Sequence, residues 1–139
     1  MEEEKSLDRF LKAQTRAYET ALKEIRAGRK STHWMWYIFP QIKGLGTSAD
    51  AEYYGIENMD EAKAYLADNI LRERLLEISE ALLKLESNDP IAILGSPDNL
   101  KLKSSMTLFA LADPSCSTFQ AVLDKFFNGE RCQKTEKIA

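Results

Sequence analysis

The sequence is poor in the residues from which most metal and nucleophile sites are built. It contains two cysteines, Cys116 and Cys132, and a single histidine, His33. One histidine excludes a zinc or iron site made of several imidazoles, and the cysteine spacing matches no metal-binding pattern. The P-loop, HExxH, CxxC, GxSxG and EF-hand motifs are missing too. We therefore expect neither a metal nor a cofactor.

Long apolar runs are absent as well. No stretch approaches the ~18 apolar residues that indicate a membrane span, so no membrane association is expected. Residues Met1–Lys5 are acidic and polar, unlike a secretory signal or an Arg-rich transit peptide. So few cysteines are typical of the reducing cytoplasm, where both thiols stay free; a Cys116–Cys132 disulfide is the alternative. The predicted location is cytoplasmic.

The composition is that of one globular domain. The 139 residues are 44% hydrophobic and 29% charged, which is ordinary for a chain that folds around one core. The formal net charge of −3 argues against a broad electrostatic surface for nucleic acid. Nucleic acid is therefore the least expected partner.

Apolar residues recur at helical spacing along most of the chain. The pattern from Leu7 to Ile25 predicts a first helix, which Ser6 is expected to cap and Gly28 to end. A second pattern, over residues 71–85, is wide enough to face a core. Residues that commonly cap helices predict where the further helices begin. The predicted caps are Thr47 or Ser48, Asn58 (with Glu61), Asp89, Ser96 and Ser117 (with Gln120), and Thr135 is predicted to begin a last turn.

These patterns predict an all-α fold. We expect a single multihelical domain over residues 1–139, with about six to eight short-to-medium helices joined by short loops. No repeat and no low-complexity linker divides the chain. Residues 1–5 are expected to fray, and residues 130–139 to form a weakly packed tail.

The segment 32–41, with the sequence THWMWYIFPQ, is dense in aromatic residues and contains no acid. We predict a short helix that begins at a cap, Ser31 or Thr32, and that Pro40 stops. A buried strand over residues 34–39 is the alternative, because periodicity does not decide so short a run.

Three side chains of this segment are candidates for a site. On a helix Trp34 lies ~200° round the axis from Trp36, so the two face different surroundings, and one of them is expected to line a pocket. His33 is the only side chain whose ordinary pKa lies near neutrality, which makes it the candidate general acid or base. The alternative is that all three are core or capping residues.

Basic residues occur in two stretches without any acid. Arg26, Arg29, Lys30 and Lys43 lie in the first, and Lys101 and Lys103 in the second. In a net-acidic protein such stretches predict a local anion site, although chance clustering on a solvated face is the alternative.

The glycine-containing loop Gly44–Ser48 precedes a predicted helix. Glycines let the backbone approach a ligand, and a helix start offers N–H groups for an anion; alternatively the glycines only turn the chain. With the lysines and hydroxyls of the later stretch, this gives the following predicted binding residues: Trp34, Trp36, Gln41, Lys43, Gly44, Gly46, Ser48, Tyr54, Lys101, Lys103, Ser104 and Ser105.

Several motifs together resemble a known family. They are His33–Gln41 (HWMWYIFPQ), Gly44–Gly46 (GLG), Tyr54–Ile56 (YGI) and Leu100–Phe109 (LKLKSSMTLF). The chain is similar, over roughly residues 7–135, to a family of bacterial domains labelled as of unknown function and sometimes called calpastatin-like. The resemblance implies a multihelical fold and supplies no function. Calpain inhibitors are long, disordered and repetitive, so the calpastatin label implies nothing about this chain.

These observations lead to one functional expectation and one rival. We expect a site for a small anionic ligand of a nucleotide-like or phosphate-bearing kind, with His33 as the acid or base if chemistry follows binding. The alternative function is a protein-interaction module that binds a protein partner through the aromatic segment.

Overall fold

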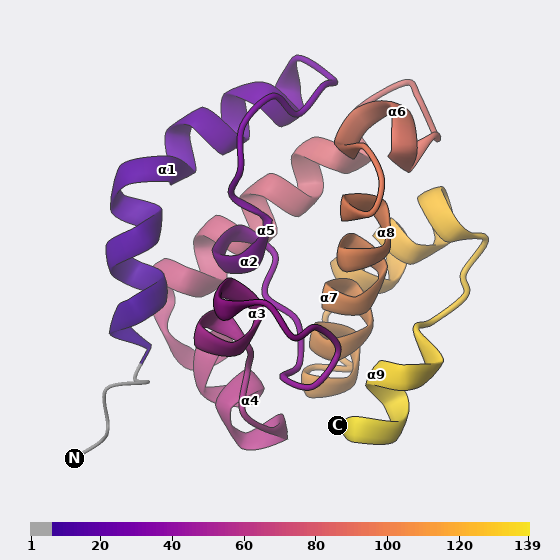
Figure 1. Cartoon of the computed structure of the whole chain (residues 1–139). Coiled ribbons are helices and arrows are strands. Elements are labelled where there is room, and N and C mark those ends of the chain that lie inside the picture. Colours follow the sequence, from indigo (N-terminus) through magenta and orange to yellow (C-terminus); the bar gives the residue numbers. More distant parts are fainter. Residues whose placement is uncertain (1–6) are drawn as a thin grey trace.

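The computed structural model describes residues 7–139, which form nine helices (Figure 1). Five of them have seven or more residues, and the remaining short ones bring the number slightly above the expected six to eight. Their bounds are α1 Asp8–Arg26, α2 Met35–Ile38, α3 Ala49–Tyr54, α4 Met59–Ala67, α5 Asn69–Leu83, α6 Pro90–Leu94, α7 Asp98–Ala112, α8 Ser117–Phe127 and α9 Gln133–Ile138. The predicted all-α single domain is confirmed. The predicted cap Ser6 and the N-terminus 1–5 lie outside the described residues.

Helix α7 is the centre of the fold, and α4, α6, α8 and α9 all pack against it (Figure 1). Helix α5 lies between α1 and α8 and packs against both of them. Every residue of α7 from Ser104 to Ala110 is buried. A helix that is enclosed on all sides buries its polar residues too, and here Ser104, Ser105 and Thr107 are among them.

Most predicted caps act as expected. Ser48, Asn58 and Asp89 each accept a backbone hydrogen bond at the start of α3, α4 and α6. Gly28, with φ +83°, ends the first helix in the left-handed region that favours glycine.

Two predicted caps are wrong. Helix α8 has Cys116 rather than Ser117 at its cap position, without a side-chain hydrogen bond, and Gln120 instead donates to Asp124 and to the Gly129 carbonyl. Helix α7 begins after Pro97, so Ser96 lies one residue too early to cap it. In both helices the cap position differs by one residue from the predicted one, and no side chain caps either helix.

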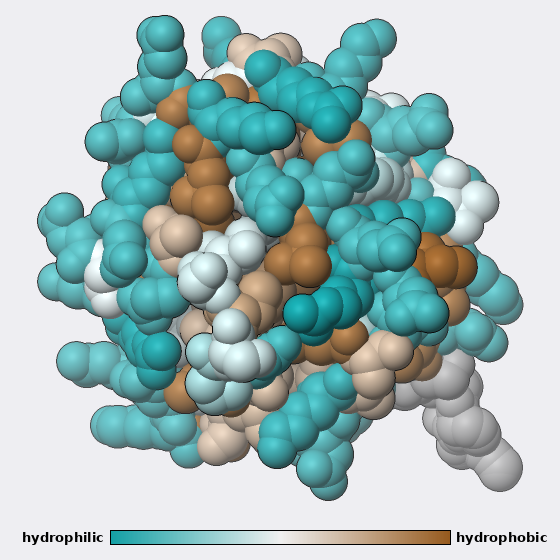
Figure 2. Space-filling view, turned by 180° about the vertical axis from the view of Figure 1, so that it is seen from behind, coloured by the Kyte–Doolittle hydropathy of each residue, from teal (hydrophilic) through white to brown (hydrophobic). Residues whose placement is uncertain are grey.

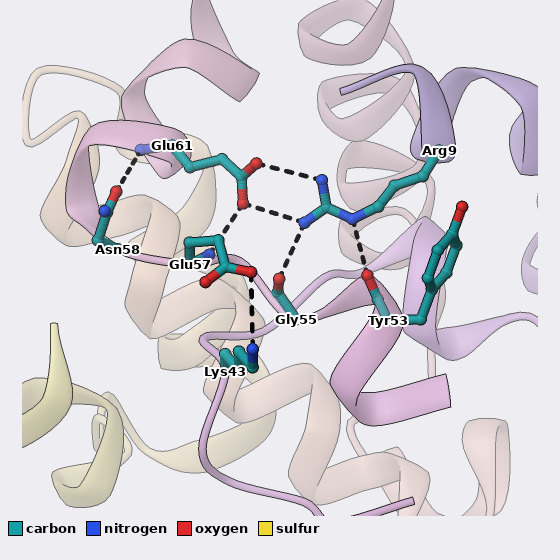
Figure 3. Close-up of polar contacts among 7 residues, drawn as sticks. All are labelled: Arg9, Lys43, Tyr53, Gly55, Glu57, Asn58 and Glu61. Atoms are coloured by element: carbon teal, nitrogen blue, oxygen red, sulfur yellow. Dashed lines mark hydrogen bonds and ion pairs between the residues drawn. The ribbon is translucent and has the colours of Figure 1, made fainter. Parts of the chain in front are cut away.

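A buried arginine fixes the chain around α3 and α4 (Figure 3). The Arg9 guanidinium donates to both carboxylate oxygens of Glu61, at 3.0 and 3.1 Å, and to the carbonyls of Tyr53 and Gly55, at 2.8 and 2.9 Å. Glu61 also accepts from the Glu57 N–H at 2.8 Å. The start of the chain thus holds the segment 53–57 by charge-assisted hydrogen bonds.

That segment in turn positions the loop after the aromatic segment. The Lys43 N–H donates to the Ile56 carbonyl at 2.8 Å, and the Ile56 N–H donates to the Gln41 carbonyl at 2.9 Å. Gly55 permits this close approach, because a Cβ at its position would lie 2.8 Å from the Ala51 carbonyl oxygen and 2.9 Å from the Lys43 Cα. Residues 41–43 are therefore fixed although they belong to no helix.

In the described part of the chain, no helix is both long enough and apolar enough to cross a membrane.

Candidate functional site

The aromatic segment contributes mainly to the core. It forms only one helical turn, α2, so the preference for a helix over a strand is confirmed for residues 35–38 alone. Trp34 and Phe39 are each 1% exposed. Trp36 is half-buried and is the tryptophan that reaches the surface, so one tryptophan of the pair faces outward as predicted. The predicted helical angle does not apply, because Trp34 precedes α2 and has non-helical backbone geometry.

The predicted caps Ser31 and Thr32 are wrong, because α2 begins at Met35 with Trp34 at its cap position and no side-chain cap hydrogen bond. Glu24, at the end of α1, instead binds the chain that precedes α2. Its carboxylate accepts from the Ser31 and Thr32 N–H groups, the Thr32 hydroxyl and the Trp34 indole N–H, at 2.7–3.1 Å. Burial of the carboxylate opposes its ionisation, but these hydrogen bonds outweigh it and lower the pKa of Glu24 to about 2. Ser31 and Thr32 therefore join the segment to α1 and do not cap α2.

Acids from elsewhere neutralise the basic stretches. Asp98 pairs with both Lys30, at 2.9 Å, and Lys101, at 3.3 Å. Lys43 lies 3.8 Å from Glu52 and 3.7 Å from Glu57. A stretch that is acid-free in sequence is therefore not acid-free in space.

A cleft of about 900 Å³, here called the main cleft, lies between three parts of the chain. Its walls are the loop that follows the aromatic segment, the first half of α7, and the chain around the start of α9. The lining residues are Gln41, Leu45, Gly46, Pro97, Leu100, Lys101, Lys103, Ser104, Glu130, Arg131, Cys132, Gln133, Lys134 and Glu136.

The main cleft is positively charged although the protein is net acidic. Lys101, Lys103, Arg131 and Lys134 line it, against two acids, Glu130 and Glu136. The Lys103 ammonium lies 3.4 Å from Glu130, whose side chain is 73% exposed. Such an exposed ion pair is worth about 0–1 kcal/mol, so a bound anion competes with it at low cost.

A thiol lies in the same cleft. The Ser104 hydroxyl donates to the Cys132 Sγ at 3.3 Å, and the Cys132 N–H donates to the Thr107 hydroxyl at 2.9 Å. Burial of the thiol opposes ionisation, but the hydrogen bond from Ser104, the adjacent Thr135 hydroxyl and the nearby backbone N–H groups of Lys134 and Thr135 favour the thiolate and outweigh this effect. The pKa of Cys132 is consequently lowered from its ordinary value.

The structure brings part of the predicted set together. Five predicted binding residues line the main cleft: Gln41, Gly46, Lys101, Lys103 and Ser104. Trp34 and Ser105 are instead fully buried, and Ser48 caps α3. Gly44, with φ +107°, turns the chain. Lys43 forms the ion pairs given above rather than lining the cleft.

His33, Trp36 and Tyr54 lie in smaller hollows beside the main cleft. Both His33 and Trp36 line a hollow of about 510 Å³, shared with Tyr54, and one of about 370 Å³. The smaller hollow shares Pro97 and Lys101 with the main cleft. The predicted residues thus lie along a row of hollows rather than in one pocket.

Lys101 lies between the main cleft and the smaller of the two other hollows. Its ammonium lies 4.7 Å from the centre of the Trp36 ring, a cation–π contact, and Lys101 lines both the main cleft and the smaller hollow that contains Trp36. Among the lining residues that sequence reasoning missed are Arg131, Cys132 and Lys134. Two cations flanking a cysteine within four residues were the available signal, but the tail was expected to pack weakly.

The C-terminal residues 130–139 bring these side chains to α7. Helix α9 packs against α7, and its Thr135 is fully buried, whereas the other residues of α9 are exposed. Cys116 and Cys132 are both free thiols. Within residues 7–139, no group of three or more His, Cys, Asp or Glu side chains is arranged to hold a metal ion.

Comparison with known proteins gives a consistent result. The model of a family described as "Protein of unknown function (DUF1810)" matches residues 4–139. Among solved structures, the chain is similar to the crystal structure of the conserved hypothetical protein Rv1873 from Mycobacterium tuberculosis. The two sequences are 44% identical, the alignment covers 94% of each chain, and the TM-score is 0.92. No curated protein matches the chain.

Proposed function

The chain belongs to the DUF1810 family, whose function is unknown, and we propose that it binds a small anionic molecule in the main cleft. The observation that carries this proposal is the charge of the cleft in a protein of net charge −3. Four basic side chains line it, and the acids beside them are two lining residues, Glu130 and Glu136, together with Asp98, which pairs with Lys101. Phosphate and carboxylate groups are the ligands that such surroundings favour.

The remaining lining residues suit a small molecule rather than a bare ion. A volume of about 900 Å³ lies within the usual range for small-molecule sites. Gln41 and Ser104 offer an amide and a hydroxyl, while Leu45, Pro97 and Leu100 offer apolar surface. The proposed ligand therefore has one or more anionic groups together with a less polar part.

The proposal extends to phosphate and carboxylate compounds in general, not to nucleotides in particular. Stacking of a base requires an aromatic wall. Trp36 lines the smaller hollows and contacts the Lys101 ammonium, and the residues that line the main cleft include no aromatic ring. The chemistry shared by the favoured ligands is thus the anionic group alone.

Catalysis by His33 is not included in this proposal. A general base is normally oriented by a hydrogen-bond partner and lies within reach of the bound ligand. His33 is exposed and lines the two smaller hollows, and its ring makes no hydrogen bond among the described residues. Binding is the activity that the arrangement supports.

The rival function, a protein-interaction module, has less support. Within residues 7–139, the large exposed hydrophobic residues are Tyr53, Ile70, Ile91, Leu100 and Ile138, which lie on five different helices and outside the aromatic segment. On the face shown in Figure 2, hydrophobic residues appear in separate small areas between hydrophilic side chains. Scattered apolar residues of this kind are ordinary on a monomer surface.

Equilibrium titration with inorganic pyrophosphate and with citrate tests the proposal. Calorimetry and thermal unfolding at constant ionic strength, with chloride as the reference anion, would detect binding of the phosphate compound or of the carboxylate compound to the protein. A ligand at 100 times its Kd adds about 2.7 kcal/mol to the free energy of unfolding. Because screening weakens charge contacts, affinity should fall as salt rises.

The matched variants are Lys101→Ala/Lys134→Ala, in the cleft, and Lys12→Ala/Lys63→Ala, two exposed lysines outside it. Both pairs change the net charge equally. We expect the cleft pair to lose affinity about tenfold or more and the outside pair to change it little. No binding of either probe by the wild type, or equal losses in both pairs, would refute the proposal.

For the location, we propose the cytoplasm. Both cysteines are free, and free thiols persist in a reducing compartment. Fractionation of the native host tests this directly.

A further inference from the structure

We propose that Cys132 is a nucleophilic thiol which forms a mixed disulfide with an anionic, disulfide-containing small molecule held in the main cleft. This inference deepens the function proposed above, since it rests on the same cleft and names a class of reactant for it. The geometry around the sulfur carries it, in the following steps.

The backbone of Cys132 is fixed from α7. Its N–H donates to the Thr107 hydroxyl at 2.9 Å, and that hydroxyl donates to the Lys103 carbonyl at 2.8 Å. Thr107 is fully buried, so this anchor lies inside the fold. The side chain meanwhile lines the cleft, which places a sulfur at a defined point of a hollow large enough for a ligand.

The Ser104 hydroxyl has two acceptors for one hydrogen. It lies 3.1 Å from the Leu100 carbonyl oxygen and 3.3 Å from the Cys132 Sγ. A hydrogen bond to an ionised acceptor is roughly twice as strong as one to a neutral acceptor. If the thiol ionises, the Ser104 hydroxyl should therefore donate to the sulfur, and only its bond to the Leu100 carbonyl within α7 is lost.

A second, independent observation concerns Thr135. Its side chain is 0% exposed, and its Oγ1 makes no hydrogen bond of regular geometry among the described residues. A buried hydroxyl without a partner destabilises the fold. The Thr135 hydroxyl lies against the Cys132 thiol, and an ionised sulfur is the acceptor that it lacks.

The surrounding charges select the reactant. Lys101, Lys103, Arg131 and Lys134 line the same cleft as the sulfur. They attract a disulfide that carries carboxylates and stabilise the thiolate that leaves it. A neutral disulfide gains neither advantage.

The proposed step is a thiol–disulfide exchange, which needs no other oxidant. The Cys132 thiol loses its proton to solvent, and the thiolate attacks one sulfur of the bound disulfide. A new S–S bond forms as the old one breaks, and the second half leaves as a thiolate that takes up a proton. Cys132 is oxidised to the level of a disulfide, and the leaving half is reduced to a thiol.

Reaction rates with two reagents test this inference on the full chain. The probes are dithiobis(nitrobenzoate), which is a dianionic disulfide, and dithiodipyridine, which is neutral. Cys116→Ser leaves Cys132 as the reacting thiol, and Cys132→Ser leaves Cys116, which lies outside the cleft. The same variants unfolded in urea give the intrinsic rates of the two thiols.

For each thiol, the rate constant of the folded protein with the dianionic reagent is divided by that of the unfolded protein. We expect this ratio to be about tenfold or more larger for Cys132 than for Cys116. In the Cys116→Ser background, Lys101→Ala/Lys134→Ala should lower the preference for the dianionic reagent, whereas Lys12→Ala/Lys63→Ala should not. Ser104→Ala should move the pH–rate profile of Cys132 to higher pH.

Two results would overturn the inference. One is that Cys132 reacts no faster than Cys116 by this measure; the other is that the cleft and outside lysine pairs change the reagent preference equally. Pyrophosphate and citrate binding by Cys132→Ser separates the two proposals. Binding without a reactive thiol would overturn this inference alone, and a reactive, anion-selective thiol without binding would overturn only the reversible binding function.

Discussion

Replacement of Arg9 by alanine is expected to destabilise the protein strongly. The side chain of Arg9 is 0% exposed and that of Glu61 is 15% exposed, so both charges are largely removed from water. The substitution would leave the Glu61 carboxylate without its two guanidinium bonds, and the carbonyls of Tyr53 and Gly55 without their donors. The buried Gly55 carbonyl would have lost its guanidinium donor, and the Glu61 carboxylate would keep the Glu57 N–H as a partner but no positive charge.

The magnitude follows from this geometry. Breaking a buried ion pair by removing one partner costs about 3–5 kcal/mol, because the other charge stays buried. Domains of this size have a total stability of about 5–15 kcal/mol, so Arg9→Ala would remove a large part of it. Arg9→Lys keeps the charge but loses the planar fork of donors. We expect this variant to fall between Arg9→Ala and the wild type.

Urea denaturation at neutral pH measures these differences, with Arg26→Ala as the control. Arg26 and Glu77 are 3.8 Å apart, and their side chains are 61% and 50% exposed. Such a surface pair contributes about 0–1 kcal/mol. If Arg9→Ala costs no more than Arg26→Ala, the reasoning about burial is refuted.

The same substitution should loosen the loop that forms one wall of the main cleft. Arg9 holds the segment 53–57, to which residues 41–43 are bonded through Ile56. Hydrogen exchange at the Lys43 and Ile56 amides should therefore accelerate more than exchange in α8, which lies outside this network. Equal acceleration throughout would indicate a loss of global stability only.

Two further predictions concern the aromatic segment. The pKa of Glu24 is about 2 in the folded protein against an ordinary 4.5, so the ionised carboxylate stabilises the fold above pH 4.5 and this stabilisation is lost as pH falls toward 2. The difference in free energy of unfolding between wild type and Glu24→Gln, measured by urea unfolding, should therefore shrink from pH 4.5 toward pH 2. A difference that stays constant over this range would contradict the prediction. Trp34→Ala should cost about 3–5 kcal/mol, because Trp34 is 1% exposed. Trp36→Ala should cost less, since Trp36 is half-buried and its contact with Lys101 is worth about 0.5–1 kcal/mol; the reverse order in urea unfolding would show that the two roles are exchanged.

The candidate site was predictable only in part. Gln41, Gly46, Lys101, Lys103 and Ser104 do line one cleft, as residues with anion-binding chemistry in two separate stretches suggested. The third wall was missed because nothing local in residues 130–136 indicates that they pack onto α7. The basic character of single stretches was also misleading, because Asp98 neutralises lysines from both of them.

The sequence by itself determined the helices, their approximate ends and the all-α class. Helical hydrogen bonds and caps such as Ser48, Asn58 and Asp89 act within a few residues, so the local pattern contains the information. Only the tertiary structure decided the cleft, the burial of Arg9 and the surroundings of Cys132. These depend on contacts between residues far apart in the chain, such as Arg9 with Glu61 and Ser104 with Cys132, which no local pattern encodes.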